Sequence, residues 1–411
     1  MESKKPLIFY GAGRYAESHL HQWIKKGICP ACFADIDEKK HFHQITLKGV
    51  SPEGGTGYDI LPLNEAIKRY PDYEIFISAS YDFPLIMDYL LDKGIERTRF
   101  YRLQSGSKWC PVLGTDFIIH GPGVQTCCRV GAFCLPSKGN IIDDLKQYKS
   151  YCDFLINQLN DDNGLYTPCE DCYMLCDGKN RNEDKIKTVN LSSGLPGGDH
   201  CNFTCVYCVY GKEFNHYRRD DNVSEIFQYL QENIKPEHIA YACGEITISP
   251  YRDRILQLWK ENKLKGQILT NAAIYNQDIF DLLATGQISI NCSIDAGTRE
   301  TFEKIKGKDC YYKVLDNLEK YASSGGKIQL KYILLNGINS NEHDIMGFIQ
   351  FSKKIGAEVV LSPDNRKSNE KMSHDEYDLF MRFINCCKQY EINYSIIEAY
   401  SPEDLDAISE V

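Results

Sequence analysis

The region from residue 187 to residue 364 alternates between short apolar runs and amphipathic stretches, and this pattern restricts the folds open to the chain. The apolar runs predict six strands, at Thr188 to Ser192, His238 to Cys243, Gln267 to Thr270, Ile288 to Ile294, Ile328 to Leu335 and Glu358 to Leu361. The stretches between them predict helices near Val223 to Ile234, Arg252 to Asn262, Gln277 to Ala284, Tyr312 to Ser323 and Asp344 to Lys354. Such an α/β repeat predicts a partial (β/α)6 TIM-like barrel, open on one side, with function at the carboxyl ends of its strands.

A second and smaller α/β pattern covers residues 6 to about 104. It predicts strands at Pro6 to Tyr10, Ala31 to Ile36 and Glu74 to Ser78, and helices near Tyr15 to Lys26, Leu63 to Arg69 and Pro84 to Lys93. Alternation of this kind implies a parallel sheet with crossover helices. We therefore expect a separate small α/β domain before the barrel.

A glycine-rich turn joins the first strand and helix of this small domain. It reads G-x-G-x-x-A from Gly11 through Gly13 to Ala16, and Asp35 follows at the end of the second strand, where a carboxylate can hold ribose hydroxyls. The segment resembles the small Rossmann-like domains found beside sugar-modifying enzymes of surface-polysaccharide pathways. That resemblance implies nucleotide or sugar-nucleotide binding; the alternative is that the glycines only form a tight turn.

Composition excludes several classes of protein. The net charge of the 411-residue chain is -10, and its Lys and Arg residues do not cluster into a basic stripe. Both observations argue against a general nucleic-acid binder. The first residues lack the apolar core of a signal peptide, and no apolar run approaches the roughly 18 residues of a membrane span. We therefore expect a cytoplasmic protein. Its 18 cysteines then point to reduced thiols used for metal binding or catalysis.

Three of these cysteines lie close together in a loop directly after the first strand of the barrel. Cys201, Cys205 and Cys208 are spaced C-x3-C-x2-C behind a glycine-containing segment that begins at Gly197. Three thiolates can hold three irons of a [4Fe-4S] cluster and leave the fourth iron open to a small molecule. Zinc is the competing interpretation, but a second ligand pair does not follow Cys208 within about 20 residues.

The loop resembles the signature of the radical S-adenosylmethionine (radical SAM) enzymes. The resemblance implies that S-adenosylmethionine (SAM) binds the open iron and is cleaved to methionine and a 5′-deoxyadenosyl radical, which takes hydrogen from a substrate. It also implies an external electron donor such as a flavodoxin or ferredoxin. Tyr207 stands where the family places an aromatic residue beside the adenine, although a tyrosine there can equally anchor the loop.

The resemblance extends to the ends of the following strands. Gly244 and Glu245 match the end of the family's Gly-Gly-Glu motif, with Cys243 in place of the first glycine, and the resemblance implies contact with the methionine amino group. Asn271 and Ser293 end the next two strands, where the family often places polar contacts to SAM. Alternatively, Asn271 caps the turn that follows it. Asp295 closes the same strand end as Ser293 and has the same implied role, with an ordinary loop residue before Gly297 as the alternative.

A second cysteine group lies in the weakly periodic segment from 106 to 186. Cys169, Cys172 and Cys176 have the spacing C-x2-C-x3-C, which suits an auxiliary iron–sulfur cluster with Cys152 or an earlier cysteine as fourth ligand. Zinc and a loose set of reduced thiols are the alternatives.

These observations divide the chain into four parts: a Rossmann-like domain over 1–105, the cysteine-rich segment over 106–186, the barrel over 187–364 and a helix–strand extension over 365–411. The expected function is a radical SAM reaction, with a carbohydrate or sugar nucleotide of a surface-glycan pathway as substrate. Modification of a peptide or protein is the alternative. A hypothesis of another class is a zinc-binding adaptor without catalytic activity and with a nucleotide-sensing domain.

Overall fold

The chain was analysed as a computed structural model. The structure describes residues 5–46, 57–80, 82–104, 106–120, 123–127, 134–172, 174–178, 185–191, 201–208, 223–242, 244–262, 264–364 and 372–396. It divides into two compact units. The first comprises Met1–Thr115, Gln125–Leu135 and Leu145–Asp184, and the second comprises Asp116–Val124, Pro136–Asp144 and Lys185–Val411.

The first unit contains the small α/β sheet that the sequence predicts. Its strands lie in the order β3 (Gln44–Thr46), β4 (Gly57–Leu61), β2 (Pro30–Ala34), β1 (Leu7–Tyr10) and β5 (Glu74–Ile77). All neighbours are parallel except β3 and β4. The helices are α1 (Arg14–Lys25), α2 (Leu63–Arg69) and α3 (Phe83–Asp92). The predicted strands and helices are therefore confirmed, and β3 and β4 are additions to them.

Aromatic side chains fill the core of this sheet. Phe9 on β1 stacks on Phe76 of β5 with ring centroids 4.3 Å apart, and Trp23 of α1 meets Phe9 edge-on at 5.6 Å. All three side chains are buried. This packing fixes α1 on one face of the sheet, because large rings contribute much of the burial in a domain of this size.

The rest of the first unit consists of short strands, single turns and most of one long helix, which begins in the second unit. The strand pairs are β6 (Arg102–Leu103) with β11 (Gly164–Leu165), and β7 (Lys108–Trp109) with β12 (Cys176–Asp177). The short turns are η1 (Glu38–Lys40), η3 (Arg97–Arg99) and η4 (Pro168–Asp171). Helix α4 (Ile141–Asn160) was not predicted from the sequence.

The second unit is built on a ten-stranded sheet. Its strands lie in the order β10 (Cys134–Pro136), β9 (Gly123–Gln125), β8 (Asp116–His120), β13 (Thr188–Leu191), β14 (His238–Tyr241), β15 (Lys265–Leu269), β16 (Ile288–Ser293), β17 (Ile328–Ile333), β18 (Glu358–Ser362) and β19 (Tyr394–Ile396). From β8 to β19 all pairs are parallel. The α/β class and the six predicted barrel strands are confirmed, and the sheet continues beyond them on both sides.

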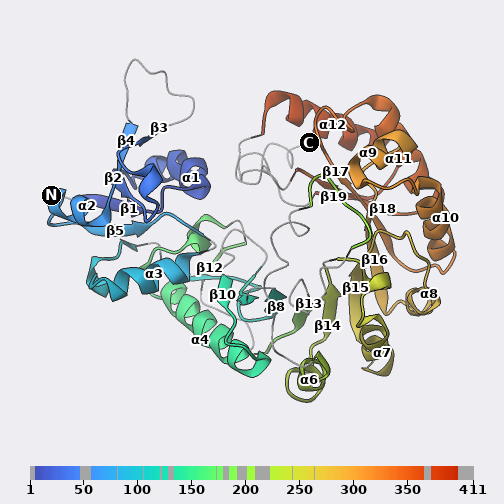
Figure 1. The fold of residues 1–411 in the computed structure, drawn as a ribbon, viewed down its shortest axis with the longest axis horizontal. Coiled ribbons are helices and arrows are strands. Elements are labelled where there is room, and N and C mark those ends of the chain that lie inside the picture. The colour runs from blue at the N-terminus through green and yellow to red at the C-terminus, as the bar shows by residue number, and fades with distance from the viewer. Residues whose placement is uncertain are drawn as a thin grey trace. The chain divides into compact units, whose positions relative to one another are not determined.

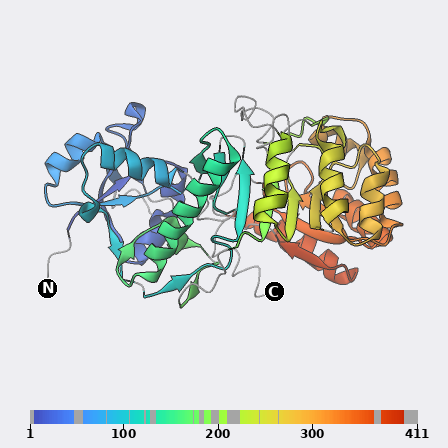
Figure 2. The same ribbon diagram turned by 90° about the horizontal axis from the view of Figure 1, so that it is seen from below.

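Helices alternate with these strands, as expected for parallel units. They are α6 (Val223–Tyr229) with the π-helical turn η5 (Leu230–Ile234), η6 (Ile246–Ile248), α7 (Arg252–Asn262), α8 (Gln277–Ala284), α9 (Arg299–Lys306), α10 (Tyr311–Ala322), α11 (Glu342–Ile355) and α12 (His374–Gln389). Figure 1 shows α7, α8, α10 and α11 along the outer side of the strands, and Figure 2 shows the yellow-to-orange helices side by side in one layer. Helix α9 was missed from the sequence.

The two faces of the sheet differ in polarity. On β16, Ile288, Ile290 and Cys292 share one face, and α8 packs against this strand. The alternate residues Ser289, Asn291 and Ser293 face the other way. The register places Gln329 beside Asn291 and Lys331 beside Ser293 on β17. One face of this sheet is therefore apolar and meets helices, and the other carries amide, hydroxyl and ammonium groups.

Within the described residues, no helix is long and apolar enough to cross a membrane.

Candidate functional site

Cys201, Cys205 and Cys208 lie on one loop in the second unit. The Cys201 and Cys208 residues are exposed, and Cys205 is half-buried. The Cys208 N–H donates to the Cys205 carbonyl at 3.0 Å, which closes a turn between these two cysteines. Burial raises the pKa of the Cys205 thiol to about 11; a nearby ammonium opposes this, and the two other thiols raise it further. The three cysteines thus share one short loop. Residues 197–200, and Cys243 farther on, lie outside the described residues.

The end of helix α9 holds this loop. The backbone N–H of Thr204 donates to the Lys306 carbonyl at 3.1 Å, and that of Val206 donates to the Ile305 carbonyl at 2.9 Å. Gly307 ends the helix with a φ of 66°, a conformation that favours glycine. A Cβ atom at Gly307 would lie 2.2 Å from Thr204 Oγ1. A larger residue at position 307 would therefore force the Thr204 side chain to move, in addition to adopting an unfavourable φ.

A buried charge network lies beneath the loop. Asp295 and Lys306 form an ion pair, and their side chains are almost completely shielded from solvent. The Tyr207 hydroxyl donates to Asp295 Oδ2 at 2.6 Å, and Lys306 Nζ donates to that hydroxyl at 2.7 Å. The Ile333 N–H of β17 also donates to Asp295, at 2.7 Å. Tyr207 is therefore tied to the protein through its hydroxyl, which is the loop-anchor role.

Electrostatics favour the charged form of Lys306. Burial lowers the pKa of the Lys306 ammonium, but Asp295 raises it, and the balance lies above the ordinary value. Burial also raises the pKa of the Tyr207 phenol, and Asp295 raises it further. Asp295 has a φ of 57°, so its backbone adopts the left-handed region that non-glycine residues seldom enter. Such strain is retained only where the surroundings fix the residue firmly.

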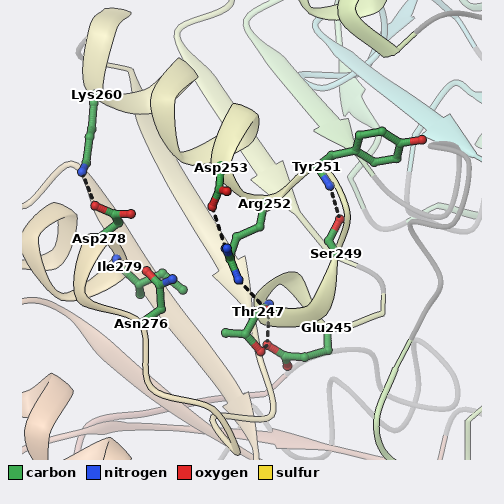
Figure 3. A network of polar contacts seen from close by, with 10 residues as sticks. All are labelled: Glu245, Thr247, Ser249, Tyr251, Arg252, Asp253, Lys260, Asn276, Asp278 and Ile279. Carbon is green, nitrogen blue, oxygen red and sulfur yellow. Dashed lines mark hydrogen bonds and ion pairs between the residues drawn. The ribbon is translucent and has the colours of Figure 1, made fainter.

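Glu245 is buried at the end of β14 and binds two neighbouring segments. Its carboxylate accepts from the N–H and the hydroxyl of Thr247 at 3.0 and 2.7 Å, from the Thr270 hydroxyl at 2.8 Å and from the Asn271 N–H at 2.6 Å. Figure 3 shows the contact with Thr247, whose carbonyl in turn accepts from Arg252. Burial raises the pKa of Glu245, although these hydrogen bonds lower it. Gly244 precedes it with a φ of 65°.

Asn271 connects the end of β15 to the cysteine loop. Its Nδ2 lies 3.7 Å from Cys201 Sγ and donates to Asn202 Oδ1 at 2.6 Å. Its Oδ1 accepts from the Ala273 N–H at 3.0 Å, so it also caps the turn that follows. Ser293 ends β16 on the polar face of the sheet and is half-buried. The structure thus brings Asn271 to the cysteines directly and places Ser293 two strand ends along from Glu245.

Lys306 was not predicted from the sequence, which left two interpretations of Asp295 open, a polar contact at the strand end and an ordinary loop residue. The signal for the helix that carries Lys306 was present: Thr298 caps its start by accepting from the Thr301 N–H, and Gly307 ends it. The contact of Lys306 with Asp295 could not be read from the sequence, because it depends on how the helix end meets the strand end.

The second cysteine group is gathered differently from the predicted set. In the first unit, Cys169 and Cys172 line a small cavity together with Cys110 and Cys127. Cys176 is exposed on β12. Cys152 is buried in α4, and neither of these two lines the cavity.

The glycine turn of the first unit is held by Asp35. Its Oδ2 accepts from the Ala12 N–H at 2.7 Å and from Lys40 Nζ at 3.0 Å, and its Oδ1 accepts from the Asp37 N–H at 2.9 Å. Gly11 has a φ of 107°, and a Cβ there would lie 3.4 Å from the Ser78 carbonyl oxygen. Gly13 precedes α1 and has no heavy atom near its Cβ position. The carboxylate is thus engaged by the turn itself, and a ribose would have to compete for it.

A family model matches the region of the chain that contains the cysteine loop. The model of the radical SAM superfamily matches residues 195–351. This part of the chain belongs to the radical SAM superfamily. The match contains all three cysteines of the loop and the strands from β14 to β17.

Curated relatives match through this radical SAM domain. GTP 3',8-cyclase of Aliarcobacter butzleri is 26% identical over 189 residues, covering 44% of this chain and 56% of that protein. GTP 3',8-cyclase of Clostridium botulinum is 29% identical over 166 residues, covering 38% of this chain and 50% of that protein. The chain thus spans about half the length of the curated relatives that it matches.

Solved structures with a similar arrangement include Streptococcus suis SuiB bound to the precursor peptide SuiA. That match has a TM-score of 0.43 and 15% identity, and covers 67% of this chain and 57% of SuiB. Native anSMEcpe with bound AdoMet matches with a TM-score of 0.41 and 15% identity, covering 51% of this chain and 63% of that one.

Membership of the superfamily implies a [4Fe-4S] cluster and SAM, and the donor set of the loop fits them. Thiolates are the usual protein ligands of iron–sulfur clusters. The loop offers three, and the amide of Asn271 reaches Cys201, where a hydrogen bond to sulfur tunes a cluster.

Proposed function

We propose that this chain is a radical SAM enzyme in which Cys201, Cys205 and Cys208 hold a [4Fe-4S] cluster with one open iron. The observation that carries the proposal is the meeting of the cysteine loop with the end of β15, where Asn271 lies 3.7 Å from Cys201. This places the thiols at the carboxyl edge of a parallel sheet, which is the functional edge of barrels of this type. When bound, the cluster and SAM supply a 5′-deoxyadenosyl radical for hydrogen abstraction.

The protein contributes orientation. Glu245 fixes the Asn271 backbone through the hydrogen bond at 2.6 Å and is itself fully buried, so we assign it a positioning role for the strand ends. Asn271 is the residue that faces both the loop and the strand edge. Lys306 and Asp295 fix Tyr207 and thereby the segment between the last two cysteines. Gly244 allows the chain to turn at the end of β14. Ser293 is a further candidate contact to SAM or substrate.

The polar face of the sheet supports a hydroxyl-rich substrate such as a carbohydrate or sugar nucleotide. Two of its amide oxygens, Asn190 Oδ1 on β13 and Asn291 Oδ1 on β16, are buried without a hydrogen-bond partner among the described residues. Buried polar groups normally have partners, so a substrate with many hydroxyl groups would satisfy them. The curated relatives named above carry GTP in their names and are thus consistent with a nucleotide-linked substrate.

Substrate-dependent formation of 5′-deoxyadenosine tests the proposal. The anaerobically reconstituted full chain, supplied with a flavodoxin or a chemical reductant, should cleave SAM, and sugar nucleotides should raise the rate above that seen with peptides. The Cys205→Ala variant should lose all SAM cleavage. Cys386→Ala removes a half-buried thiol of α12 and should keep it.

Each alternative gives a different result in this experiment. If peptides and not sugar nucleotides raise the rate of SAM cleavage, the substrate is a peptide or protein. The proposed radical chemistry would still hold. A colourless protein that contains zinc, lacks iron and does not cleave SAM would support the adaptor hypothesis and refute the enzyme.

A further inference from the structure

The first unit contains a cavity surrounded by cysteine sulfurs. Cys110, Cys127, Cys169 and Cys172 line it, and its volume is about 20 Å³. A cavity needs roughly 10–15 Å³ to hold a sphere of water size, so the space is large enough for one small ion. The remaining lining is apolar and consists of Val112, Leu113 and Leu175.

The four cysteines come from three separated segments of the chain. Cys110 follows β7, and Cys127 lies two residues beyond β9. Cys169 and Cys172 belong to the turn η4 and its end, where the Cys172 N–H donates to the Cys169 carbonyl at 3.0 Å. Convergence of thiols from distant segments on one apolar pocket is unexpected for ordinary core residues, since a chain of this length has many other apolar side chains to fill such a space.

The local backbone places N–H donors beside one of the thiols. The N–H groups of Val112 and Leu113, two and three residues after Cys110, form hydrogen bonds with its sulfur. Cys169 is itself buried, and all four thiols line the same cavity. Four thiols so close together repel one another when ionised, and a bound cation removes that repulsion.

We propose that Cys110, Cys127, Cys169 and Cys172 bind one metal centre through four thiolates, either a zinc ion or an iron–sulfur cluster. Both centres use tetrahedral thiolate sets. Across the described residues, no three His, Cys, Asp or Glu side chains are already grouped tightly enough to hold an ion. Binding of a zinc ion would therefore draw the four sulfurs inward around the cavity and displace their protons.

This ligand set differs from the one expected from spacing alone. Cys152 forms part of the apolar side of α4, with Tyr148 and Leu155 buried on the same side. Its thiol interacts with the Tyr148 side chain and the Gly114 backbone, and burial raises its pKa to about 12. Cys176 is the other candidate ligand, because it belongs to the same C-x2-C-x3-C motif as Cys169 and Cys172. It is exposed, however, and lies outside the cavity lining.

Metal analysis tests the proposal in a protein that lacks the radical SAM cluster. In the full chain with Cys201→Ala, Cys205→Ala and Cys208→Ala, any tightly bound metal must lie elsewhere. We expect either one zinc or about four irons with matching sulfide per chain. Adding Cys110→Ser, Cys127→Ser, Cys169→Ser or Cys172→Ser should remove most of it, whereas Cys152→Ser and Cys176→Ser should keep it.

X-ray absorption on the triple variant provides a readout that needs no further substitution. Four sulfur neighbours are expected, at about 2.3 Å for zinc, and iron–iron scattering would identify a cluster instead. The proposal is overturned if the triple variant holds neither metal, if nitrogen or oxygen replaces a sulfur, or if Cys110→Ser or Cys127→Ser retains the metal. Because the radical SAM ligands are already absent, none of these results depends on the proposed enzymatic function.

Discussion

The two cysteine groups of this protein differ in how the chain presents its sulfurs. Cys201, Cys205 and Cys208 come from eight consecutive residues, and two of the three are exposed. The second group comes from three segments and lines an apolar cavity. The first group lies over charged and amide side chains, and the second is surrounded by aliphatic ones.

This difference separates two uses of thiolates. As proposed ligands on an exposed loop, the first three thiolates would leave a coordination position that a small molecule can reach, and the polar network below holds the loop in place. Four proposed ligands around an enclosed pocket would leave no such position. Chemistry is therefore expected at the first group, and structural stabilisation or electron transfer at the second.

The largest expected effect is a difference in the survival of the two centres in air. Oxygen reaches an open iron more readily than an enclosed centre, so the wild type should lose about four irons rapidly and retain the metal of the second group. Time courses of iron and zinc content in wild type and in the Cys201, Cys205 and Cys208 triple Ala variant would measure this. A rapid phase that persists in the triple variant would contradict the comparison.

Next in size is the effect of removing Lys306. Lys306→Met leaves the buried Asp295 carboxylate without its cation, and breaking a buried ion pair in this way costs about 3–5 kcal/mol. Denaturant unfolding should show this loss of stability, together with reduced cluster incorporation, since Tyr207 loses a partner.

Two variants control this experiment. Lys304→Met changes an exposed lysine of the same helix and should alter the free energy of unfolding by less than about 0.5 kcal/mol. Adding Asp295→Asn to Lys306→Met removes the unpaired charge and should recover part of the loss. A loss below about 1 kcal/mol for Lys306→Met would mean that the pair contributes little to holding the loop.

Gly307→Ala should have the third largest effect. It places an L-residue at a φ of 66° and directs its Cβ against Thr204 Oγ1. The backbone strain costs about 1–2 kcal/mol and the overpacking roughly 1–3 kcal/mol more. Gly325→Ala is the matched control, because it has a φ of 75° and nothing within 4 Å of its Cβ position. Equal losses of unfolding free energy in the two variants would show that the cysteine loop accommodates the added methyl group without a further loss of stability.

Much of the fold could be predicted because its elements are locally encoded. Helices α7 and α8 match the predicted bounds in full, and the six barrel strands were each found within a few residues of their predicted ends. In each case apolar periodicity and a cap or turn residue agree. Helix α4 was missed although Leu145, Tyr148, Cys152 and Leu159 recur at helical spacing and are buried. This helical period lies within the cysteine-rich segment, which is weakly periodic as a whole.

The site could be predicted only where its residues are close in sequence. The loop of Cys201, Cys205 and Cys208 carries its own spacing, and the strand ends give Glu245 and Asn271. Cys110 and Cys127 have no spacing that relates them to Cys169, because their convergence depends on tertiary structure. The same holds for Lys306 and Asp295, which approach each other through the end of a helix and the end of a strand.

A smaller effect is expected from Thr270→Val at the Glu245 cluster. The Thr270 hydroxyl donates to both carboxylate oxygens of Glu245, at 2.8 and 3.0 Å. Loss of a donor to a buried charged acceptor costs about 1–3 kcal/mol, and the donors that remain place this case near the lower limit. Thr285→Val, at an exposed helix end, is the control and should change the unfolding free energy by less than about 0.5 kcal/mol. An equal loss of unfolding free energy in both variants would contradict the positioning role proposed for Glu245.

The smallest expected effect, Cys176→Ser, tests the comparison most closely. Cys172 and Cys176 belong to one C-x2-C-x3-C motif, yet Cys172 lines the cavity and Cys176 is exposed on β12, opposite Trp109. If enclosure defines the second centre, Cys176→Ser should leave metal content unchanged and stability within about 0.5 kcal/mol of wild type, whereas Cys172→Ser should lose the metal. Loss of metal from the Cys176 variant would instead show that the exposed end of the motif closes over the centre, and the contrast between an open and an enclosed group would no longer hold.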